Sequence, residues 1–250
     1  MHPDTQTLIT ALIEARQSGQ PLRAADWVGA VHNDAEAYVV QDGVAAGLGW
    51  GQGALARHWK SGGATRSGPF SHAPLDPAGI NPVRQTWPLL GIEAEVALRL
   101  GRDVSPEAAL AMTPETAEDW VDAMAVAVEL VASRWADGLA APALLRMADH
   151  QSHAGLVLGP WQPFAARDWS VQTCRVEIGS ETPVTRTGSH SLNDPAWVLP
   201  AWLQHLTRQG TTVAAGTVVT TGSWVGCLPV RPGERVCVGF EGLGEVVVSV

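Results

Sequence analysis

The sequence predicts an α+β fold with a mainly β core, and three patterns in its 250 residues support this prediction. Residues 91–101 (GIEAEVALRLG) place their large apolar side chains at every second position, which is typical of a strand. Residues 123–131 (AMAVAVELV) form an apolar run suited to a buried strand. From residue 216 onward, strand-like segments are separated by Pro-Gly and Gly-Leu-Gly turns. Helical periodicity is found outside these segments, so separate helices and a β core are expected.

The N-terminal part is expected to contain two helices followed by a loop. Residues 4–17 carry apolar side chains at helical spacing, with Asp4 or Thr5 as the N-cap. These side chains are Leu8, Ile9, Leu12 and Ile13. A second helix is expected around residues 34–44. Residues 61–82 are rich in Gly, Pro and Ser, which predicts a long loop.

Two further helices are expected later in the chain. The segment Thr113-Pro114-Glu115-Thr116 is typical of a helix start, with Thr113 as the cap and Pro114 at the first position. Residues 195–208 form an amphipathic pattern that opens near Asp194. The expected C-terminal strands are residues 217–222, 234–240 and 244–250.

Composition and charge exclude several classes of protein. The net charge of −9 argues against nucleic acid as a partner, because phosphate contacts need clustered Lys and Arg. No apolar run approaches the roughly 18–20 residues of a membrane span, and the opening residues lack a basic leader region. The three cysteines, Cys174, Cys227 and Cys237, lack metal-ligand spacing, so a reduced, cytoplasmic protein is expected. There is no Gly-rich nucleotide motif and no serine-hydrolase elbow.

Lys60 is the only lysine among 16 basic residues. A chain that uses Arg wherever a plain positive charge suffices retains lysine where Arg cannot substitute. A lysine ammonium is compact and can lose its proton when buried, and a guanidinium does neither. Lys60 is therefore a candidate functional residue, with survival of one surface lysine as the alternative.

Three glutamates form a candidate metal site. Glu93 and Glu95 are two residues apart on the expected strand, so their carboxylates project from the same face. Glu129 lies within the apolar run 123–131, where an unpaired carboxylate would cost several kcal/mol, roughly 2–7 for a neutral polar group and more for a charge. Carboxylates from two strands are a reasonable ligand set for Mg²⁺ or Mn²⁺. A solvent-facing strand edge is the alternative for the first pair.

Motifs along nearly the whole chain resemble those of a known family. They are AYVVQ (37–41), WK (59–60), GIEAE (91–95), VEL-x-x-SR (128–134), ADHQS (148–152), TGS (221–223) and PGERV…FEGLG (232–244). In this order they resemble the 2-keto-4-pentenoate hydratase branch of the fumarylacetoacetate hydrolase superfamily. Each motif is short, and their order and spacing together carry the resemblance.

The resemblance implies a mixed β-roll with a small helical N-terminal portion, assembled as a homo-oligomer. It implies that Glu93, Glu95 and Glu129 bind Mg²⁺ or Mn²⁺, which chelates a pyruvate-like substrate. It also implies a catalytic lysine at Lys60, a functional aspartate at Asp149, and substrate binding by the TGS segment. The residues of that segment assigned to the substrate are Thr221 and Ser223.

The chain also departs from the family pattern. The acidic segment that usually follows the lysine is replaced by SGGATRSGPFSHAPL (61–75), in which His72 is the nearest polar candidate. The asparagine of the ADN segment is His150, and the acid before the SR pair is Ala132. The general acid–base candidates are accordingly Asp149, His72 and His150, in that order. For His150 and for His153, surface or capping roles are the expected alternatives.

The expected activity is metal-dependent hydration of a 2-hydroxy-2,4-dienoate to a 4-hydroxy-2-oxo acid. The alternatives are a 4-oxalocrotonate-type decarboxylase, an acylpyruvate C–C hydrolase and a non-catalytic subunit. The expected organisation is a helical portion at residues 1–70, which carries Lys60, and a metal-binding β-roll at residues 71–250, together forming one compact unit. The expected partner is a small 2-oxo acid or dienoate, with no nucleic acid and no membrane.

Overall fold

The computed structural model describes residues 4–51, 55–82 and 87–250. The helices are α1 Thr5–Ser18, α2 Asp34–Gly47, α3 Pro106–Ala111, α4 Ala143–Ala148 and α5 Leu199–Thr207. The strands of the larger sheet are β1 His58–Gly62, β2 Ser71–Pro74, β3 Gly91–Leu100, β4 Val121–Val131, β5 His153–Leu158, β6 Gln162–Pro163 and β9 Val218–Thr220. Those of the smaller sheet are β7 Thr173–Ile178, β8 Val184–Thr187, β10 Arg235–Phe240 and β11 Gly244–Ser249.

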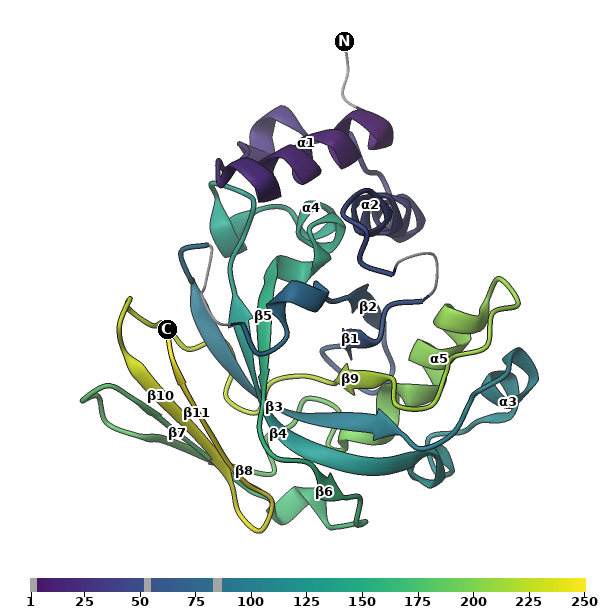
Figure 1. The fold of residues 1–250 in the computed structure, drawn as a ribbon, viewed down its shortest axis with the longest axis vertical. Helices are drawn as coiled ribbons and strands as arrows, with labels where there is room; N and C mark the ends of the chain where they lie inside the picture. Colours follow the sequence, from purple (N-terminus) through teal and green to yellow (C-terminus); the bar gives the residue numbers. More distant parts are fainter. Residues whose placement is uncertain (1–3, 52–54, 83–86) are drawn as a thin grey trace.

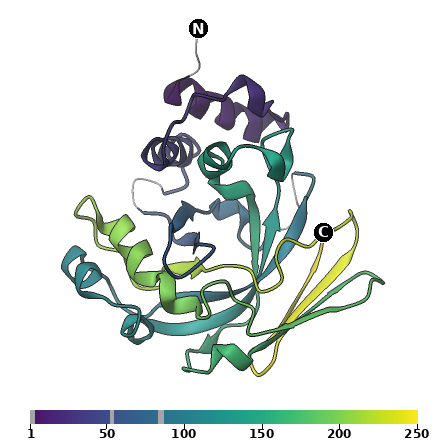
Figure 2. The ribbon, with the colours of Figure 1, turned by 180° about the vertical axis from the view of Figure 1, so that it is seen from behind.

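Two sheets form the body of the protein (Figure 1). The larger sheet has the order β2-β1-β9-β3-β4-β5, and β6 also pairs with β4. The smaller sheet is antiparallel with the order β11-β10-β7-β8. Both views show α1, α2 and α4 gathered at one end, with the smaller sheet on one side of β3 and β4 (Figure 2). The predicted α+β class with a β core is confirmed.

The long strand pair β3–β4 has one apolar face and one face that carries acidic side chains. Alternate residues of β3, from Ile92 to Leu100, are buried in a core that also contains Val176, Val236 and Phe240 of the smaller sheet. Because side chains alternate along a strand, Glu93 and Glu95 project from the opposite face. The alternation predicted for residues 91–101 therefore decides which face of the sheet carries the acids.

The N-terminal helices are capped as their sequences predict. The Asp4 carboxylate accepts a hydrogen bond from Thr7 N, and the Thr7 hydroxyl accepts one from Asp4 N, which completes a capping box. Asn33 caps α2 in the same way by accepting from Glu36 N. The two helices and α4 bury a second apolar cluster that includes Leu8, Leu12, Val40, Val44 and Leu145.

The helix expected over residues 195–208 is also present. The Asp194 carboxylate accepts from Ala196 N and begins a 3-10 turn, Pro195–Val198, that continues into α5. Trp202 and Leu203 of α5 are fully buried in the main core. The three C-terminal strands are found as β9, β10 and β11.

Two local predictions were wrong. Residues 61–82 are not one long loop, because residues 71–74 form β2, which pairs with β1 with Lys60 opposite Ala73. No α-helix begins at Thr113 either: residues 113–116 form a turn, followed by a 3-10 helix at Ala117–Trp120. The α-helix of this region is α3, which Ser105 caps eight residues earlier.

Strand β1 is N-terminal to the division expected at residues 70 and 71, yet it pairs with β2 and, in parallel, with β9. The strand that carries Lys60 is thus part of the same sheet as β3 and β4. The division itself stays a prediction. Within the described residues, no helix is both long and apolar enough to cross a membrane.

Candidate metal centre and active-site pocket

Three carboxylates converge on the face of the larger sheet that points away from the smaller one. Glu93 on β3 lies directly opposite Glu129 on β4 in the strand register, and Glu95 follows two residues later on the same face. One carboxylate oxygen from each of the three residues lies within 4.8 Å of the others. The structure therefore brings together the three acids that the sequence singled out.

The three carboxylates are largely buried, and their negative charges repel one another. Glu95 and Glu129 are only 2% and 1% exposed. Burial, followed by repulsion from Glu129 and Glu93, raises the pKa of Glu95 to about 8. Burial and Glu129 likewise raise the pKa of Glu93. Among the described residues, the second oxygens of Glu95 and Glu129 have no hydrogen-bond partner. A divalent cation fits this donor set, because it prefers oxygen ligands and would offset the repulsion.

Lys60 reaches this cluster from β1. Its Nζ lies 2.6 Å from Glu129 Oε1 and donates a longer hydrogen bond, 3.4 Å, to the Gln151 carbonyl. Burial alone would lower the pKa of Lys60, but Glu129, Glu93 and Glu95 together raise it. Lys60 is therefore held as an ammonium beside the acids, where its charge is opposite to theirs.

His153 is a further member of the cluster: the surface position expected for it is wrong, although it is the C-cap residue of the 3-10 helix His150–Ser152, as the capping alternative allowed. It begins β5 and is fully buried, with Nδ1 3.5 Å from Glu129 Oε1. Burial lowers the pKa of His153 although Glu129 opposes this shift. Burial alone would raise the pKa of Glu129, but Lys60 and His153 lower it. The signal available was a histidine that opens the apolar run HAGLVL after the ADH motif.

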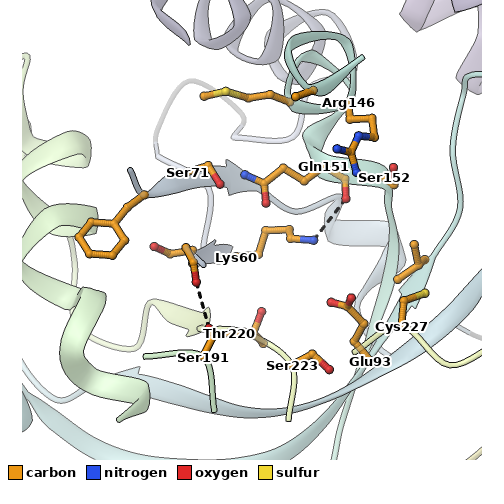
Figure 3. A pocket seen from close by; sticks show the side chains of 18 of the residues that line it. Lys60, Ser71, Glu93, Arg146, Gln151, Ser152, Ser191, Thr220, Ser223 and Cys227 are labelled. Atoms are coloured by element: carbon orange, nitrogen blue, oxygen red, sulfur yellow. Dashed lines mark hydrogen bonds between the residues drawn. The ribbon is translucent and has the colours of Figure 1, made fainter. Parts of the chain in front are cut away.

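A pocket of about 620 Å³ opens over the cluster (Figure 3). Its size is within the usual range for small-molecule sites. The charged and polar lining residues are Asp34, Lys60, Ser61, Ser71, Glu93, Glu95, Arg146, Gln151, Ser152, Ser191, Thr220 and Ser223, together with the thiol of Cys227. The apolar lining residues are Pro69, Phe70, Val131, Leu139, Ala143 and Met147, besides Gly62, Gly63 and Gly222.

The structure places Asp149 in an ion-pair network. It is fully buried, and its Oδ1 accepts from Arg134 Nε at 2.6 Å and from Arg16 at 3.1 Å. Its Oδ2 accepts from the Arg134 backbone N–H at 2.9 Å. In the described part of the chain Asp149 is not among the residues that line the pocket. These contacts favour a positioning role over direct proton transfer, and the catalytic role expected for Asp149 stays a prediction.

The segment that follows Asp149 bends sharply toward the pocket. His150, Gln151 and Ser152 have φ angles of 52°, 55° and 63°, which non-glycine residues rarely adopt. His150 is buried against Trp50, with ring centroids 4.7 Å apart, whereas Gln151 and Ser152 line the pocket. The surface or capping role expected for His150 is therefore wrong, and Asp149 anchors a strained segment that presents the next two polar residues.

His72 lies on the other side of β2 from the pocket. Its neighbour Ser71 lines the pocket, whereas His72 packs near Tyr38 and His205. A 2.7 Å hydrogen bond joins His72 Nδ1 to Ser61 Oγ. Burial, followed by His205 and Arg208, lowers the pKa of His72 to about 3. Among the described residues His72 is not part of the pocket lining, and the acid–base role expected for it stays a prediction.

The two TGS residues expected to bind substrate, Thr221 and Ser223, differ in their position relative to the pocket. Ser223 lines the pocket, and its hydroxyl donates to the Gly226 carbonyl at 3.0 Å. Thr221 is buried, and its carbonyl accepts a hydrogen bond from His190 Nε2 at 3.0 Å. Its neighbour Thr220 lines the pocket beside Glu95 instead. The strand expected at residues 217–222 includes both threonines, and alternation places them on opposite faces, but the sequence does not show which face lines the pocket.

Sequence reasoning also missed Arg146, which α4 directs into the pocket (Figure 3). No motif around Arg146 distinguished it from the other arginines of the chain.

The arrangement of both sheets defines a known structural class. The crystallised 4-oxalocrotonate decarboxylase from Pseudomonas putida G7, complexed with magnesium and adipate, superposes with a TM-score of 0.76. The match covers 98% of this chain and 96% of that chain at 18% identity, so it shows the fold. Maleylpyruvate hydrolase from Sphingobium sp. SYK-6, in complex with manganese(II) and pyruvate, matches with a TM-score of 0.52 and 16% identity, over 80% and 70% of the two chains.

Residues 72–250 match the fumarylacetoacetate (FAA) hydrolase C-terminal family, and the chain belongs to this family. A 2-keto-4-pentenoate hydratase from Burkholderia vietnamiensis is 31% identical over 164 residues, which cover 62% of this chain and 58% of that protein. A 4-oxalocrotonate decarboxylase from Pseudomonas sp. is 26% identical over 159 residues, 63% and 59% of the two chains. The match thus spans less than two thirds of these relatives. The predicted resemblance to the hydratase branch is confirmed.

Proposed function

We propose that the protein is a metal-dependent hydratase that adds water to a 2-hydroxy-2,4-dienoate and yields a 4-hydroxy-2-oxo acid. The observation that carries the proposal is the convergence of three carboxylates from two paired strands beside the ammonium of Lys60. The relatives named 2-keto-4-pentenoate hydratase support the same reaction.

Glu93, Glu95 and Glu129 would hold a divalent ion, Mg²⁺ or Mn²⁺. When bound, the ion supplies Lewis-acid stabilisation of negative charge on a 2-oxo acid. The second oxygen of Glu129 has no partner among the described residues and is free for this purpose, although Lys60 contacts the first.

The remaining lining residues bind and orient the substrate. The Lys60 ammonium stabilises the charge that develops on the 2-oxygen, because it is held protonated in a buried site. Ser223 and Thr220 offer hydroxyl groups next to the acids, on the β9 side of the pocket. Val131, Leu139 and Met147 offer an apolar surface against which the carbon chain can pack.

Asp149 acts through the segment it anchors. Its two arginine contacts hold the bend at residues 150–152 and so fix Gln151, whose carbonyl accepts from Lys60 Nζ. Asp149 therefore serves as a positioning residue for Lys60 in this proposal.

A decarboxylase of a 4-oxalocrotonate-type acid is the second candidate. The favouring observation is the TM-score of 0.76 to such an enzyme over 98% of this chain. Both reactions build negative charge on the same substrate oxygen, so the same acids and Lys60 would serve either reaction.

An ultraviolet assay with 2-hydroxypenta-2,4-dienoate distinguishes the two candidates. The hydratase is supported if the dienol signal decays only with Mg²⁺ or Mn²⁺, the product is 4-hydroxy-2-oxopentanoate, and a chelator and Glu95→Gln both abolish the decay. The decarboxylase is supported if the dienol is stable and carbon dioxide is released from an oxalocrotonate-type acid. If neither substrate reacts with metal-loaded protein, both candidates are wrong.

A further inference from the structure

The segment 189–191, which follows β8, binds the backbone beside the pocket with all three of its side chains. At one end, the Ser189 hydroxyl donates to the Trp224 carbonyl at 2.6 Å. At the other end, the Ser191 hydroxyl donates to the Gly63 carbonyl at 3.0 Å (Figure 3). Ser191 and Gly63 both line the pocket. The segment therefore connects the chain after β9 to the chain after β1.

His190, the middle residue of this segment, has a ring whose proton position is defined by its contacts. Nδ1 accepts a hydrogen bond from the Leu192 backbone N–H at 3.2 Å, so the ring proton is on Nε2. Nε2 lies 3.0 Å from the Thr221 carbonyl and donates to it. His190 is buried, and burial lowers its pKa to about 4, although the Thr221 carbonyl opposes this shift. At neutral pH the ring is therefore uncharged, and its one N–H is directed at Thr221.

The segment 221–223 is the place where the chain leaves the β3 ladder beside the pocket. β9 ends at Thr220, and the chain binds β3 again where the Trp224 N–H donates to the Ala94 carbonyl at 2.9 Å. The last two residues of the segment line the pocket, and Gly222 has a φ of 122°, which favours glycine. Backbone groups outside a ladder need other partners. The imidazole N–H supplies one of them.

The segment 189–191 is itself fixed by the residues that follow it. Arg66 Nε donates to the Leu192 carbonyl at 2.5 Å, and the guanidinium lies 4.0 Å from the centroid of the Trp197 ring. The Trp197 indole N–H donates to the Arg66 carbonyl at 3.2 Å. Because these contacts hold the segment in place, its side chains can in turn hold the backbone beside the pocket.

We infer that His190 is a positioning residue for the substrate: by donating to the Thr221 carbonyl, it fixes Gly222 and Ser223 at the β9 side of the pocket. The inference rests on the proposed function, because it takes this side of the pocket as the part that contacts the 2-oxo acid. It assigns the effect to one ring nitrogen, Nε2. Metal binding by the three glutamates does not depend on this hydrogen bond.

Two variants separate the two hydrogen bonds of the imidazole. His190→Asn keeps an acceptor for the Leu192 N–H and loses the donor to Thr221, whereas His190→Gln keeps a donor to Thr221 and loses the acceptor. The ligand is 2-oxopentanoate, which is the product of the proposed reaction without its 4-hydroxyl group. It is titrated calorimetrically into the Mn²⁺-loaded protein.

We expect His190→Asn to bind 2-oxopentanoate at least about tenfold more weakly than the wild type, since loss of a residue that orients a binding group typically costs about 10–100-fold. His190→Gln is expected to retain most of the wild-type affinity. Mn²⁺ titration is expected to give wild-type affinity in both variants, which verifies that they are folded. His205→Asn replaces a partly buried histidine that is not among the described lining residues, and as the matched control it should bind 2-oxopentanoate as the wild type does.

Nuclear magnetic resonance tests the hydrogen bond without metal or ligand. Long-range ¹H–¹⁵N spectra of the metal-free protein at neutral pH are expected to show the His190 ring proton on Nε2. A proton on Nδ1 would overturn the inference, because Nε2 could not then donate to Thr221.

The binding data can also overturn the inference and leave the proposed function standing. Wild-type affinity for 2-oxopentanoate in His190→Asn would do so, and so would an equal loss in His190→Gln. A parallel loss of Mn²⁺ affinity in His190→Asn would show that His190 supports the fold as a whole and not the substrate side. If the Mn²⁺-loaded wild-type protein does not bind 2-oxopentanoate, the proposed function fails together with the inference.

Discussion

Glu93 and Glu129 lie directly opposite each other across the β3–β4 ladder, in a position where like charges repel. The pairing is tolerated because Lys60 and His153 contact Glu129 from β1 and β5. Four strands of one sheet thereby supply the side chains of a single site. The acids stay close together, and a cation that enters from the pocket meets them already positioned.

Loss of Glu93 is expected to weaken metal binding. Glu93→Gln removes one of three charged ligands, and losing even a residue that only orients a ligand costs about 10–100-fold in affinity. We expect Mn²⁺ affinity to fall at least tenfold, as measured by calorimetric titration. Glu107→Gln, an exposed glutamate on α3, is the matched control and is expected to bind Mn²⁺ as the wild type does. Unchanged affinity in Glu93→Gln would contradict the assignment of this ligand.

Loss of Lys60 is expected to separate metal binding from catalysis. Lys60→Met removes the cation that contacts Glu129, so Mn²⁺ affinity should be retained or increased. We expect kcat to fall about 10²–10³-fold, the usual cost of deleting one group that stabilises developing charge. Lys60→Arg should not restore activity, because the guanidinium is larger and planar. A loss of Mn²⁺ binding with unchanged kcat at saturating metal would contradict this role.

The acids and the lysine were predictable because they depend on local pattern. Alternation along residues 91–101 fixes the shared face of Glu93 and Glu95, and an acid within an apolar run marks Glu129 as needing a partner. Lys60 was recognisable from composition alone, because it is the only lysine in the sequence. Once β3 and β4 pair, the strand and face of Glu93, Glu95 and Glu129 are enough to bring the three carboxylates together.

The proton-transfer candidates were not predictable because they depend on long-range contacts. Asp149 is 133 residues from its partner Arg16, and nothing in the sequence indicates that this pair forms. The orientation of His72 depends on which face of β2 packs against Tyr38, and the sequence predicted a loop there. Arg146 enters the pocket only because α4 packs beside α2, which is a tertiary result (Figure 1).

The Asp149 network is expected to contribute mainly to stability. Asp149→Asn leaves the fully buried Arg134 without its counter-charge, which typically costs about 3–5 kcal/mol in the free energy of unfolding. Asp122→Asn breaks the partly exposed pair with Arg99 and should cost less than about 1 kcal/mol. Urea unfolding of both variants measures the difference. If Asp149→Asn is as stable as the wild type but loses a limb of the pH–rate profile, Asp149 transfers a proton directly.

Buried histidines are expected to make the protein sensitive to acid. Burial, followed by His205 and Arg208, lowers the pKa of His72 to about 3, and burial lowers the pKa of His190 to about 4. In the unfolded chain both titrate near 6.5, so below that pH the unfolded state binds more protons than the folded state. Their contribution to stability is therefore complete above pH 6.5 and decreases as the pH falls toward 4 and then 3. Each histidine adds a slope of up to about 1.4 kcal/mol per pH unit.

Replacement of His72 tests this origin of the acid sensitivity. His72→Asn keeps a polar partner for Ser61 Oγ and removes the titrating ring. We expect the free energy of unfolding of His72→Asn to depend less steeply on pH between 6.5 and 4 than that of the wild type, whatever its value at pH 7.5. His32→Asn, an exposed histidine, is the matched control and should leave the slope unchanged. An identical slope in His72→Asn and the wild type would show that His72 does not stay neutral in the folded protein. Since the comparison uses slopes, a uniform loss of packing in the variant does not affect the result.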